Sequence, residues 1–217
     1  MTLNKRKELT MNPSSAERNV LVRVDVQNDF IDGSLAVAQG EQVVAPLNQV
    51  ARAVRKSGGQ VVDTRDWHPP KTPHFDTWPV HCVAGTEGAE LHRGLQVERA
   101  DILLSKGMEQ TDGYSGWEGK TPRGQTLEAI IEPRSPEDKV RVFLGGLATD
   151  YCVKATALDI AERFGDDERV TLYMLRDAMR AVNMQPEDGN RAIAAMKAAE
   201  YFAITSAEAV RMIQETA

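Results

Sequence analysis

Runs of apolar, β-branched residues alternate with segments of helical periodicity from Asn19 onward. The apolar runs predict six strands, at residues 20–26, 60–64, 101–105, 139–144, 169–175 and 201–205. Segments with helical spacing predict helices at residues 42–56, 126–131, 150–164, 186–199 and 207–214. This alternation is typical of an α/β protein. We expect a doubly wound, mainly parallel, six-stranded sheet with helices on both faces.

The length and composition of the chain fit one such domain. Of the 217 residues, 41% are hydrophobic and 27% are charged, which is enough to build a buried core. We expect a single domain over residues 19–217. Residues 1–18 combine a basic cluster with polar residues and Pro, and no apolar stretch of a secretory signal follows, so they predict a disordered tail.

Charge and cysteine content narrow the choice of partner and compartment. The chain has 26 Lys and Arg against 32 Asp and Glu, a net charge of -6, which argues against nucleic acid as a partner. No window approaches the roughly 20 apolar residues of a membrane span, so no membrane association is expected. Two cysteines are too few for a disulfide scaffold and predict a cytoplasmic setting. The sequence is also compatible with a homo-oligomer.

Three of the four histidines fall within 14 residues of one another, in the first of two long loops, residues 67–92. Together with the preceding aspartate they form the pattern D-x-H-x5-H-x6-H, made by Asp66, His68, His74 and His81. Imidazoles and a carboxylate suit a divalent ion such as Zn, Fe or Mn, in a catalytic rather than a structural site. The alternative is a set of solvated histidines that turn the chain beside prolines. His92 is expected to be an ordinary surface histidine.

Reactive side chains also follow the predicted strands. Asp25, Lys106 and Cys152 lie at or just after the ends of the first, third and fourth strands, and Asp66 follows the second. The carboxyl ends of parallel strands line the ligand crevice of an open sheet, so we expect these residues to converge. Taken singly, each has a simpler explanation: a turn aspartate, a solvated lysine or a buried apolar cysteine.

Taken together, these residues predict nucleophilic catalysis. A thiol at Cys152, near a helix N-terminus, is a candidate nucleophile. A carboxylate such as Asp25 can take its proton, and an ammonium such as Lys106 can hold that carboxylate in its charged form. The backbone N–H groups of Ala148 and Cys152 are candidate oxyanion donors.

Five segments carry a resemblance to a known family. They are Asp25-Val-Gln-Asn-Asp-Phe30, Asp66-Trp-His68, Trp78-Pro-Val-His81-Cys82-Val-Ala-Gly85-Thr86, Lys106-Gly107 and Gly146-Leu-Ala-Thr-Asp-Tyr-Cys152-Val153. In order and spacing they resemble the isochorismatase-like hydrolases and, within these, the nicotinamidases (pyrazinamidases). The resemblance extends from about Asn19 to the C-terminus and implies a Rossmann-like fold.

The resemblance also implies an activity and a mechanism. It implies hydrolysis of nicotinamide, and of analogues such as pyrazinamide, to the acid and ammonia, in NAD salvage. Cys152 would attack the carboxamide carbon to form a thioester, Asp25 would shuttle the proton, and Lys106 would position and polarise this pair. A cis peptide bond is implied between Leu147 and Ala148.

The resemblance assigns the metal and the substrate pocket as well. Asp66, His68, His74 and His81 would hold one divalent ion, first of all zinc, with Fe or Mn as alternatives, and this ion would bind the pyridine nitrogen directly or through water. Four aromatic residues match or lie beside positions that wall the substrate ring: Phe30, Trp78, Tyr114 and Tyr151. Their alternative is core or lid packing. The second long loop, residues 107–124, contains five glycines and is a candidate lid, and Cys82 is expected to be structural.

Three other functions stay open at this point. Within the same superfamily they are a vinyl-ether hydrolase of the isochorismatase type and an N-carbamoyl amidase. The former does not use a cysteine nucleophile, and neither accounts for the three-histidine loop. A third alternative is a non-catalytic metal- or thiol-responsive module, or an interaction subunit.

Overall fold

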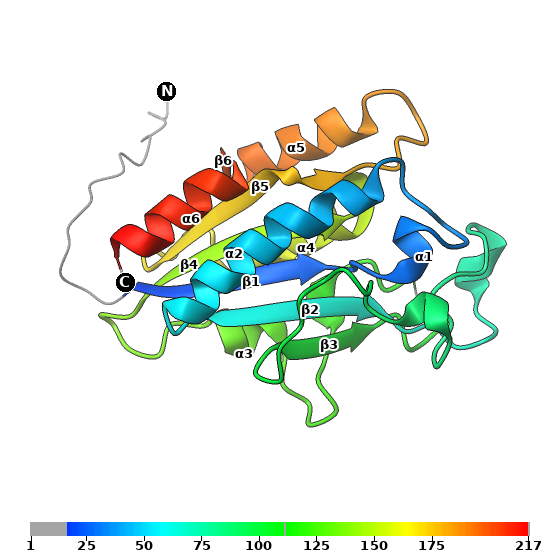
Figure 1. The fold of residues 1–217 in the computed structure, drawn as a ribbon, viewed down its shortest axis with the longest axis horizontal. Helices are drawn as coiled ribbons and strands as arrows, with labels where there is room; N and C mark the ends of the chain where they lie inside the picture. The colour runs from blue at the N-terminus through cyan, green and yellow to red at the C-terminus, as the bar shows by residue number, and fades with distance from the viewer. Residues whose placement is uncertain (1–16, 111, 217) are drawn as a thin grey trace.

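Six parallel strands form the centre of the molecule, in the order β3-β2-β1-β4-β5-β6 (Figure 1). The computed structural model describes residues 17–110 and 112–216. The strands are β1 (Glu17–Val24), β2 (Gln60–Asp66), β3 (Ile102–Lys106), β4 (Lys139–Leu147), β5 (Val170–Arg180) and β6 (Phe202–Ile204). Every neighbouring pair is parallel. The predicted doubly wound α/β fold is therefore confirmed, with a sheet that is wholly rather than mainly parallel.

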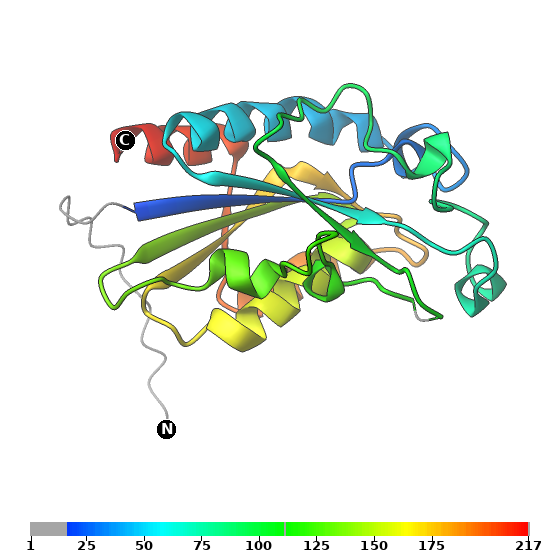
Figure 2. The same cartoon turned by 90° about the horizontal axis from the view of Figure 1, so that it is seen from below.

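Helices cover both faces of this sheet (Figure 2). One face carries α2 (Val44–Lys56) and α6 (Ser206–Glu215), and the opposite face carries α3 (Leu127–Ile131), α4 (Lys154–Phe164) and α5 (Asp188–Ala198). These five helices match the predicted ones within a few residues at each end. A short helix that was not predicted, α1 (Asn28–Ile31), follows β1.

The central strand explains why the sequence pattern was so clear. In β1, Val20, Leu21, Val22 and Val24 are all fully buried. Successive strand residues point to opposite faces, so Leu21 joins the core beneath α2 and α6, while the three valines join the core beneath α4 and α5. A strand covered on both faces reads as a continuous apolar run.

The first strand begins earlier than predicted. Glu17 and Arg18 pair in register with Lys139 and Val140 of β4. Arg18 also donates a 2.6 Å hydrogen bond to the carbonyl of Ile130, so its charged side chain is held at the end of α3. The predicted tail of residues 1–18 is therefore wrong for its last two residues, and residues 1–16 lie outside the described part of the chain.

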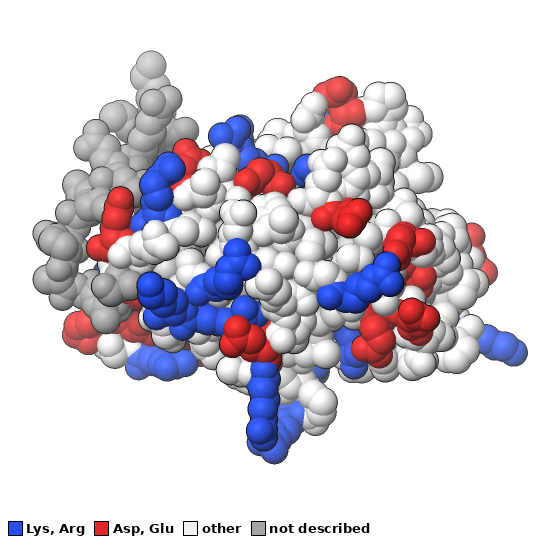
Figure 3. Space-filling view, in the orientation of Figure 1, with Lys and Arg blue, Asp and Glu red and all other residues white. Residues whose placement is uncertain are grey.

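The carboxyl ends of β1 to β4 lie at one edge of the sheet, and the two long loops pass over this edge (Figure 1). Basic and acidic side chains are interspersed on the face that Figure 3 presents. Within residues 17–110 and 112–216, no helix combines the length and the apolar character needed to cross a membrane.

Candidate active site

Lys106, the last residue of β3, lies at the centre of a buried charged cluster. Its Nζ is 2.8 Å from Asp25 Oδ2 and 2.5 Å from Asp66 Oδ1. The same ammonium donates to the carbonyl of Gly113 at 2.9 Å and contacts Cys152 Sγ at 3.7 Å. The structure thus brings together the four strand-end residues that the sequence predicted to converge, because the sheet is parallel and its strands end in register.

Asp25 is directed into this cluster by an unusual backbone conformation. Asp25 is the residue directly after β1, and its φ is 49°. This is a left-handed value that Asp tolerates better than most residues. Thr64 Oγ1 donates a 2.5 Å hydrogen bond to Asp25 Oδ1 and accepts one from the Asp25 N–H at 3.2 Å. Asp25 Oδ2 forms the ion pair with Lys106 but accepts no directed hydrogen bond. That oxygen is free to accept a proton.

The protonation of the cluster follows from its burial. Burial raises the pKa of the Asp25 carboxyl despite the nearby charge of Lys106. Burial also raises the pKa of the Cys152 thiol well above its ordinary value. For Lys106 burial acts in the opposite direction, but the charges of Asp25 and Asp66 outweigh it and raise the pKa. The resting cluster therefore contains an ammonium and a neutral thiol, and a carboxyl with a raised pKa is a stronger base.

Asp66 differs from Asp25 in its surroundings. Although burial acts to raise the pKa of Asp66, the charge of Lys106 and the nearby His68 ring lower it to about 2. Its second carboxylate oxygen lies 3.7 Å from His68 Nε2. Gln27 clamps the backbone of Asp66 on both sides, with its amide accepting from the Asp66 N–H and donating to the Asp66 carbonyl, each at 2.8 Å. Asp66 thus lies between the lysine and the histidines.

Cys152 lies in the element that follows β4. It lies in a π-helical turn, Thr149–Val153, that leads directly into α4. The peptide bond between Leu147 and Ala148 is cis, as the family resemblance implied. The Ala148 carbonyl accepts a hydrogen bond from the Tyr151 N–H at 3.1 Å, which closes the turn. N–H groups in the first turn of a helix lack an i−4 carbonyl partner and favour negative charge nearby.

The three histidines of the first loop gather at one point. One ring nitrogen from each of His68, His74 and His81 lies within 4.8 Å of the others. In all three rings Nδ1 is within hydrogen-bond distance of an oxygen: the Gly107 carbonyl at 3.0 Å, the Asp112 carboxylate at 2.7 Å and the Pro79 carbonyl at 2.7 Å, respectively. A ring that donates from Nδ1 presents an unprotonated Nε2, the form that binds a metal.

The donor set fits a divalent metal ion. His68 Nε2 is fully buried and has no hydrogen-bond partner, an arrangement that is costly unless another group binds it. His74 and His81 are also buried, so solvated loop histidines, the alternative explanation, do not describe this cluster. Three imidazoles with Asp66 at their side are ligands that zinc, iron and manganese accept.

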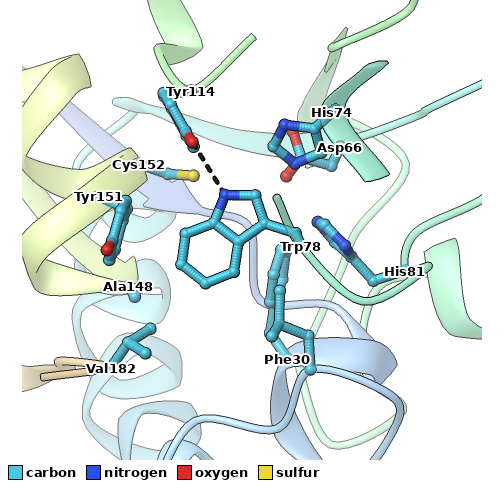
Figure 4. A pocket seen from close by; sticks show the side chains of 11 residues that line it. Phe30, Asp66, His74, Trp78, His81, Tyr114, Ala148, Tyr151, Cys152 and Val182 are labelled. Carbon is cyan, nitrogen blue, oxygen red and sulfur yellow. Dashed lines mark hydrogen bonds between the residues drawn. The ribbon is translucent and has the colours of Figure 1, made fainter. Parts of the chain in front are cut away.

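A pocket of about 350 Å³ opens beside the thiol and the histidines (Figure 4). Its lining includes Cys152 and all four predicted aromatic residues, Phe30, Trp78, Tyr114 and Tyr151. The indole N–H of Trp78 donates to the Tyr114 hydroxyl at 2.9 Å. The Trp78 and Tyr151 rings meet edge to face, with their centroids 4.8 Å apart. These contacts hold a planar-walled cavity against the Cys152 sulfur.

Several residues of the site were not among the predictions. Leu35 and Val182 line the pocket, Thr64 and Gln27 hold the two aspartates, and Asp112 contacts His74. Gln27 falls inside a segment that carried the family resemblance, so its position was a usable signal. Val182 likewise belongs to a stretch that resembles the family, whereas nothing in the local sequence marks Leu35, Thr64 or Asp112.

Two expectations outside the main cluster had different outcomes. His92 is not a surface histidine: only 8% of it is exposed, because its N–H donates to the Val26 carbonyl and its segment packs over the end of β1. Cys82 is fully buried and, like Cys152, forms no disulfide, which agrees with a structural residue. In the second loop, Trp117 packs against Phe164 of α4 and is not part of the pocket lining.

Comparison with known proteins agrees with this geometry. The isochorismatase domain family matches residues 19–208. A nicotinamidase of Acinetobacter baylyi is 33% identical over 200 residues, which cover 81% of this chain and 87% of that protein.

Two solved structures are also similar over nearly their whole length. The pyrazinamidase of Pyrococcus horikoshii in complex with zinc has a TM-score of 0.73 at 34% identity, covering 87% of this chain and 99% of that one. PnC1 of L. infantum in complex with nicotinate has a TM-score of 0.71 at 32% identity, covering 89% and 95%. The family resemblance drawn from the motifs is confirmed: this chain belongs to the isochorismatase domain family.

Proposed function

We propose that this protein is a nicotinamidase that hydrolyses nicotinamide, and analogues such as pyrazinamide, to the corresponding acid and ammonia. The observation that carries the proposal is the buried cluster of Cys152, Asp25 and Lys106 at the wall of an aromatic pocket that also includes His74 and His81. Relatives that are nicotinamidases or pyrazinamidases, similar over most of their length, support this substrate class.

The pocket suits a small, neutral, planar amide. Its walls are mostly aromatic, from Phe30, Trp78, Tyr114 and Tyr151, and such walls stack against or abut a heteroaromatic ring. Nicotinamide has no charge, so the acidic net charge of the chain does not oppose its binding. The carboxamide group would point toward Cys152, and the ring nitrogen would point toward His74 and His81.

In the first half of the reaction the Asp25 carboxylate takes the proton from the Cys152 thiol. The sulfur then bonds to the carboxamide carbon, and the C=O electron pair moves onto the oxygen, where the backbone N–H groups of Ala148 and Cys152 stabilise it. When this tetrahedral intermediate collapses, the C–N bond breaks and Asp25 delivers its proton to the leaving nitrogen. Ammonia leaves, and a thioester on Cys152 remains.

In the second half water replaces ammonia. Asp25 takes a proton from the water, the resulting hydroxide attacks the thioester carbon, and the C–S bond breaks. Asp25 then returns the proton to the Cys152 sulfur, and the acid product ionises in solvent to nicotinate. Lys106 stays protonated throughout and holds the Asp25 carboxylate 2.8 Å from its ammonium.

The three histidines, with Asp66, would hold one divalent ion, for which zinc is the first expectation and iron or manganese are alternatives. When bound, the ion supplies a Lewis-acidic site for the pyridine nitrogen, directly or through water, which orients the ring. The unpartnered, buried Nε2 of His68 supports this part of the proposal.

A role in NAD salvage and a cytoplasmic location belong to the same proposal. The reaction recovers nicotinate from the amide that cleavage of a nicotinamide cofactor releases. Two buried cysteines that remain thiols are compatible with a reducing compartment.

The test is ammonia release from nicotinamide by the purified protein and by Cys152→Ala. We expect the substitution to reduce kcat/KM by at least about 10³-fold, because no other group can form the thioester, while zinc content stays unchanged. An N-carbamoyl amino acid and isochorismate serve as competing substrates. Faster turnover of either, or full activity of Cys152→Ala, would contradict the proposal.

A further inference from the structure

The three histidines of the candidate metal site are not held in the same way. The Nδ1 atoms of His68 and His81 face backbone carbonyls, that of Gly107 at the start of the second long loop and that of Pro79 in the first. His74 differs, because its Nδ1 lies 2.7 Å from a carboxylate oxygen of Asp112, 38 residues away on the second long loop. Among the described residues, Asp112 is therefore the charged side chain that orients a metal-site histidine from outside its loop.

The backbone around Asp112 is anchored although its side chain is 56% exposed. The carbonyl of the next residue, Gly113, accepts a 2.9 Å hydrogen bond from Lys106 Nζ. Gly113 has a φ of 62°, and a Cβ atom there would lie 2.5 Å from the Gly107 Cα, so only glycine fits this close approach. One residue further, the Tyr114 hydroxyl accepts a hydrogen bond from the indole N–H of Trp78.

On the other side of Asp112 a second contact joins the two loops. Gln110 Nε2 donates to the Lys71 carbonyl at 3.3 Å. Gln110 thus contacts the first loop, and Gly113, directly after Asp112, contacts the charged cluster. The contact of Asp112 with His74 is therefore next to the anchored Gly113 carbonyl.

A carboxylate on the far nitrogen of an imidazole has two effects on the near nitrogen. It fixes the tautomer in which Nδ1 carries the proton and Nε2 is free, and it makes Nε2 a more basic ligand. It also holds the ring plane in one orientation. Removal of such partners lowers metal affinity by about 10- to 100-fold in other metal sites.

We propose that Asp112 is a positioning residue that sets the metal affinity of this site through His74. The inference rests on the metal site of the proposed function and extends it to the second loop. It assigns Asp112 no contact with the substrate or the reacting atoms. Asp112, whose carboxylate orients the metal ligand, and Gly113, whose carbonyl accepts from Lys106, are then consecutive residues.

The experiment is a zinc titration of the metal-free full-length protein against a chromophoric chelator. We expect Asp112→Ala to weaken zinc binding about tenfold, at the lower end of the range because the carboxylate is half exposed. Asp112→Asn keeps an acceptor oxygen but loses the charge, so its affinity should fall between those of the wild type and Asp112→Ala. Thermal unfolding of the metal-free variants is measured alongside and should match the wild type.

The matched control is Glu109→Gln, which removes an exposed negative charge from the same loop. Zinc affinity should be unchanged in this variant. Equal affinities in the wild type and Asp112→Ala would overturn the positioning role, and so would an equal loss in Glu109→Gln, which would point to the general charge of the loop. A wild-type protein that binds no zinc but hydrolyses nicotinamide would refute the metal site itself while leaving the amidase intact.

Discussion

Two buried charged clusters each include one residue in or directly after β1 and one residue of β2, but the two clusters have different roles. The Arg23 cluster comprises Arg23, Asp63, Asp101 and Arg55. The Lys106 cluster comprises Lys106, Asp25, Asp66 and Cys152. Along the chain the two clusters begin only two residues apart, at Arg23 in β1 and at Asp25 directly after it. What separates them is the balance of positive and negative charge.

The Arg23 cluster is balanced, and its central pair of Arg23 and Asp63 is fully hydrogen-bonded. Its two guanidinium groups face two carboxylates. Arg23 binds Asp63 through two hydrogen bonds, at 2.8 and 2.7 Å, and donates to the Gln96 carbonyl at 3.0 Å and to Asp101 at 3.2 Å. Arg55 completes the pairing of Asp101 at 2.9 Å. Arg55 Nη1 makes no hydrogen bond but forms an ion pair with Glu98 at 3.3 Å. No atom of Arg23 or Asp63 is left to bind a further group, so this cluster holds the sheet to the segment beyond Gln96.

The Lys106 cluster is unbalanced and incomplete. A single ammonium faces two carboxylates, and Asp25 Oδ2 together with the neighbouring His68 Nε2 lacks a directed hydrogen bond. Buried polar atoms without partners are costly, so they persist where another molecule or ion will bind them. The comparison teaches that an excess of carboxylates over cations, together with an unpartnered imidazole nitrogen, distinguishes the functional cluster from the structural one in this protein, whereas buried charge as such does not.

The largest effect is expected from Asp25→Asn in the Lys106 cluster. The amide cannot accept the thiol proton, so kcat/KM for nicotinamide should fall by about 10⁴-fold. The free energy of unfolding should stay the same or rise, because Lys106 and Asp66 then form a balanced pair. Ammonia release and urea unfolding measure the two quantities. A variant with near-normal turnover would remove Asp25 from the reaction.

The opposite pattern is expected from Asp63→Ala in the Arg23 cluster. It leaves a buried guanidinium with part of its pairing lost, and the free energy of unfolding should fall by about 3–5 kcal/mol. Activity per folded molecule should not change. The double variant Arg23→Met/Asp63→Leu is the control: it leaves Arg55 and Asp101 paired and should recover most of the stability. If the double variant is no more stable than Asp63→Ala, pairing is not the cause.

A smaller effect on turnover is expected from Thr64→Val, which preserves shape but removes the hydroxyl that donates to Asp25 Oδ1. A hydrogen bond to a buried charge contributes about 1.5–3 kcal/mol, so we expect kcat/KM to fall by roughly tenfold through a mispositioned carboxylate. The matched control is Thr171→Val, since Thr171 lies in β5, away from the cluster. Equal effects of the two substitutions would assign the loss to the sheet as a whole.

The smallest effect is expected from a partly exposed surface pair, Asp167 with Arg169. The hydrogen bond from Arg169 lowers the pKa of Asp167 to about 2. A lowered pKa in the folded state stabilises the protein above the ordinary Asp value of about 3.9, and this contribution is lost as the pH falls toward 2. Asp167→Asn should therefore cost about 0.5 kcal/mol at pH 7, given solvent screening. The difference should vanish near pH 2, which denaturant unfolding at both pH values tests.

The predictable part of the site consists of residues at the ends of strands. Asp25, Asp66 and Lys106 could be placed together because each follows an apolar run, and parallel strands end at one edge. The histidines could be grouped because they lie close in sequence. Thr64 and Asp112 could not be found in this way, since each acts through a partner 38 or 39 residues away whose contact depends on strand register or loop path.

Burial was the other quantity that local patterns did not reveal. His92 looks like a loop histidine in the sequence, yet a hydrogen bond to the end of β1 draws it beneath the surface. Arg23 interrupts an apolar strand and would be expected at a surface, yet it is fully buried because Asp63 lies opposite it in the neighbouring strand.

The sequence by itself determined the α/β architecture, the edge of the sheet where reactive residues gather, and the chemistry of the four metal-ligand candidates. These follow from periodicity and from short-range spacing, which the chain carries locally. Only the tertiary structure decided which charges are fully paired and which buried nitrogen lacks a partner, and it alone placed Asp112 against His74. Those properties depend on groups far apart in the chain that meet only when the sheet and its loops are assembled.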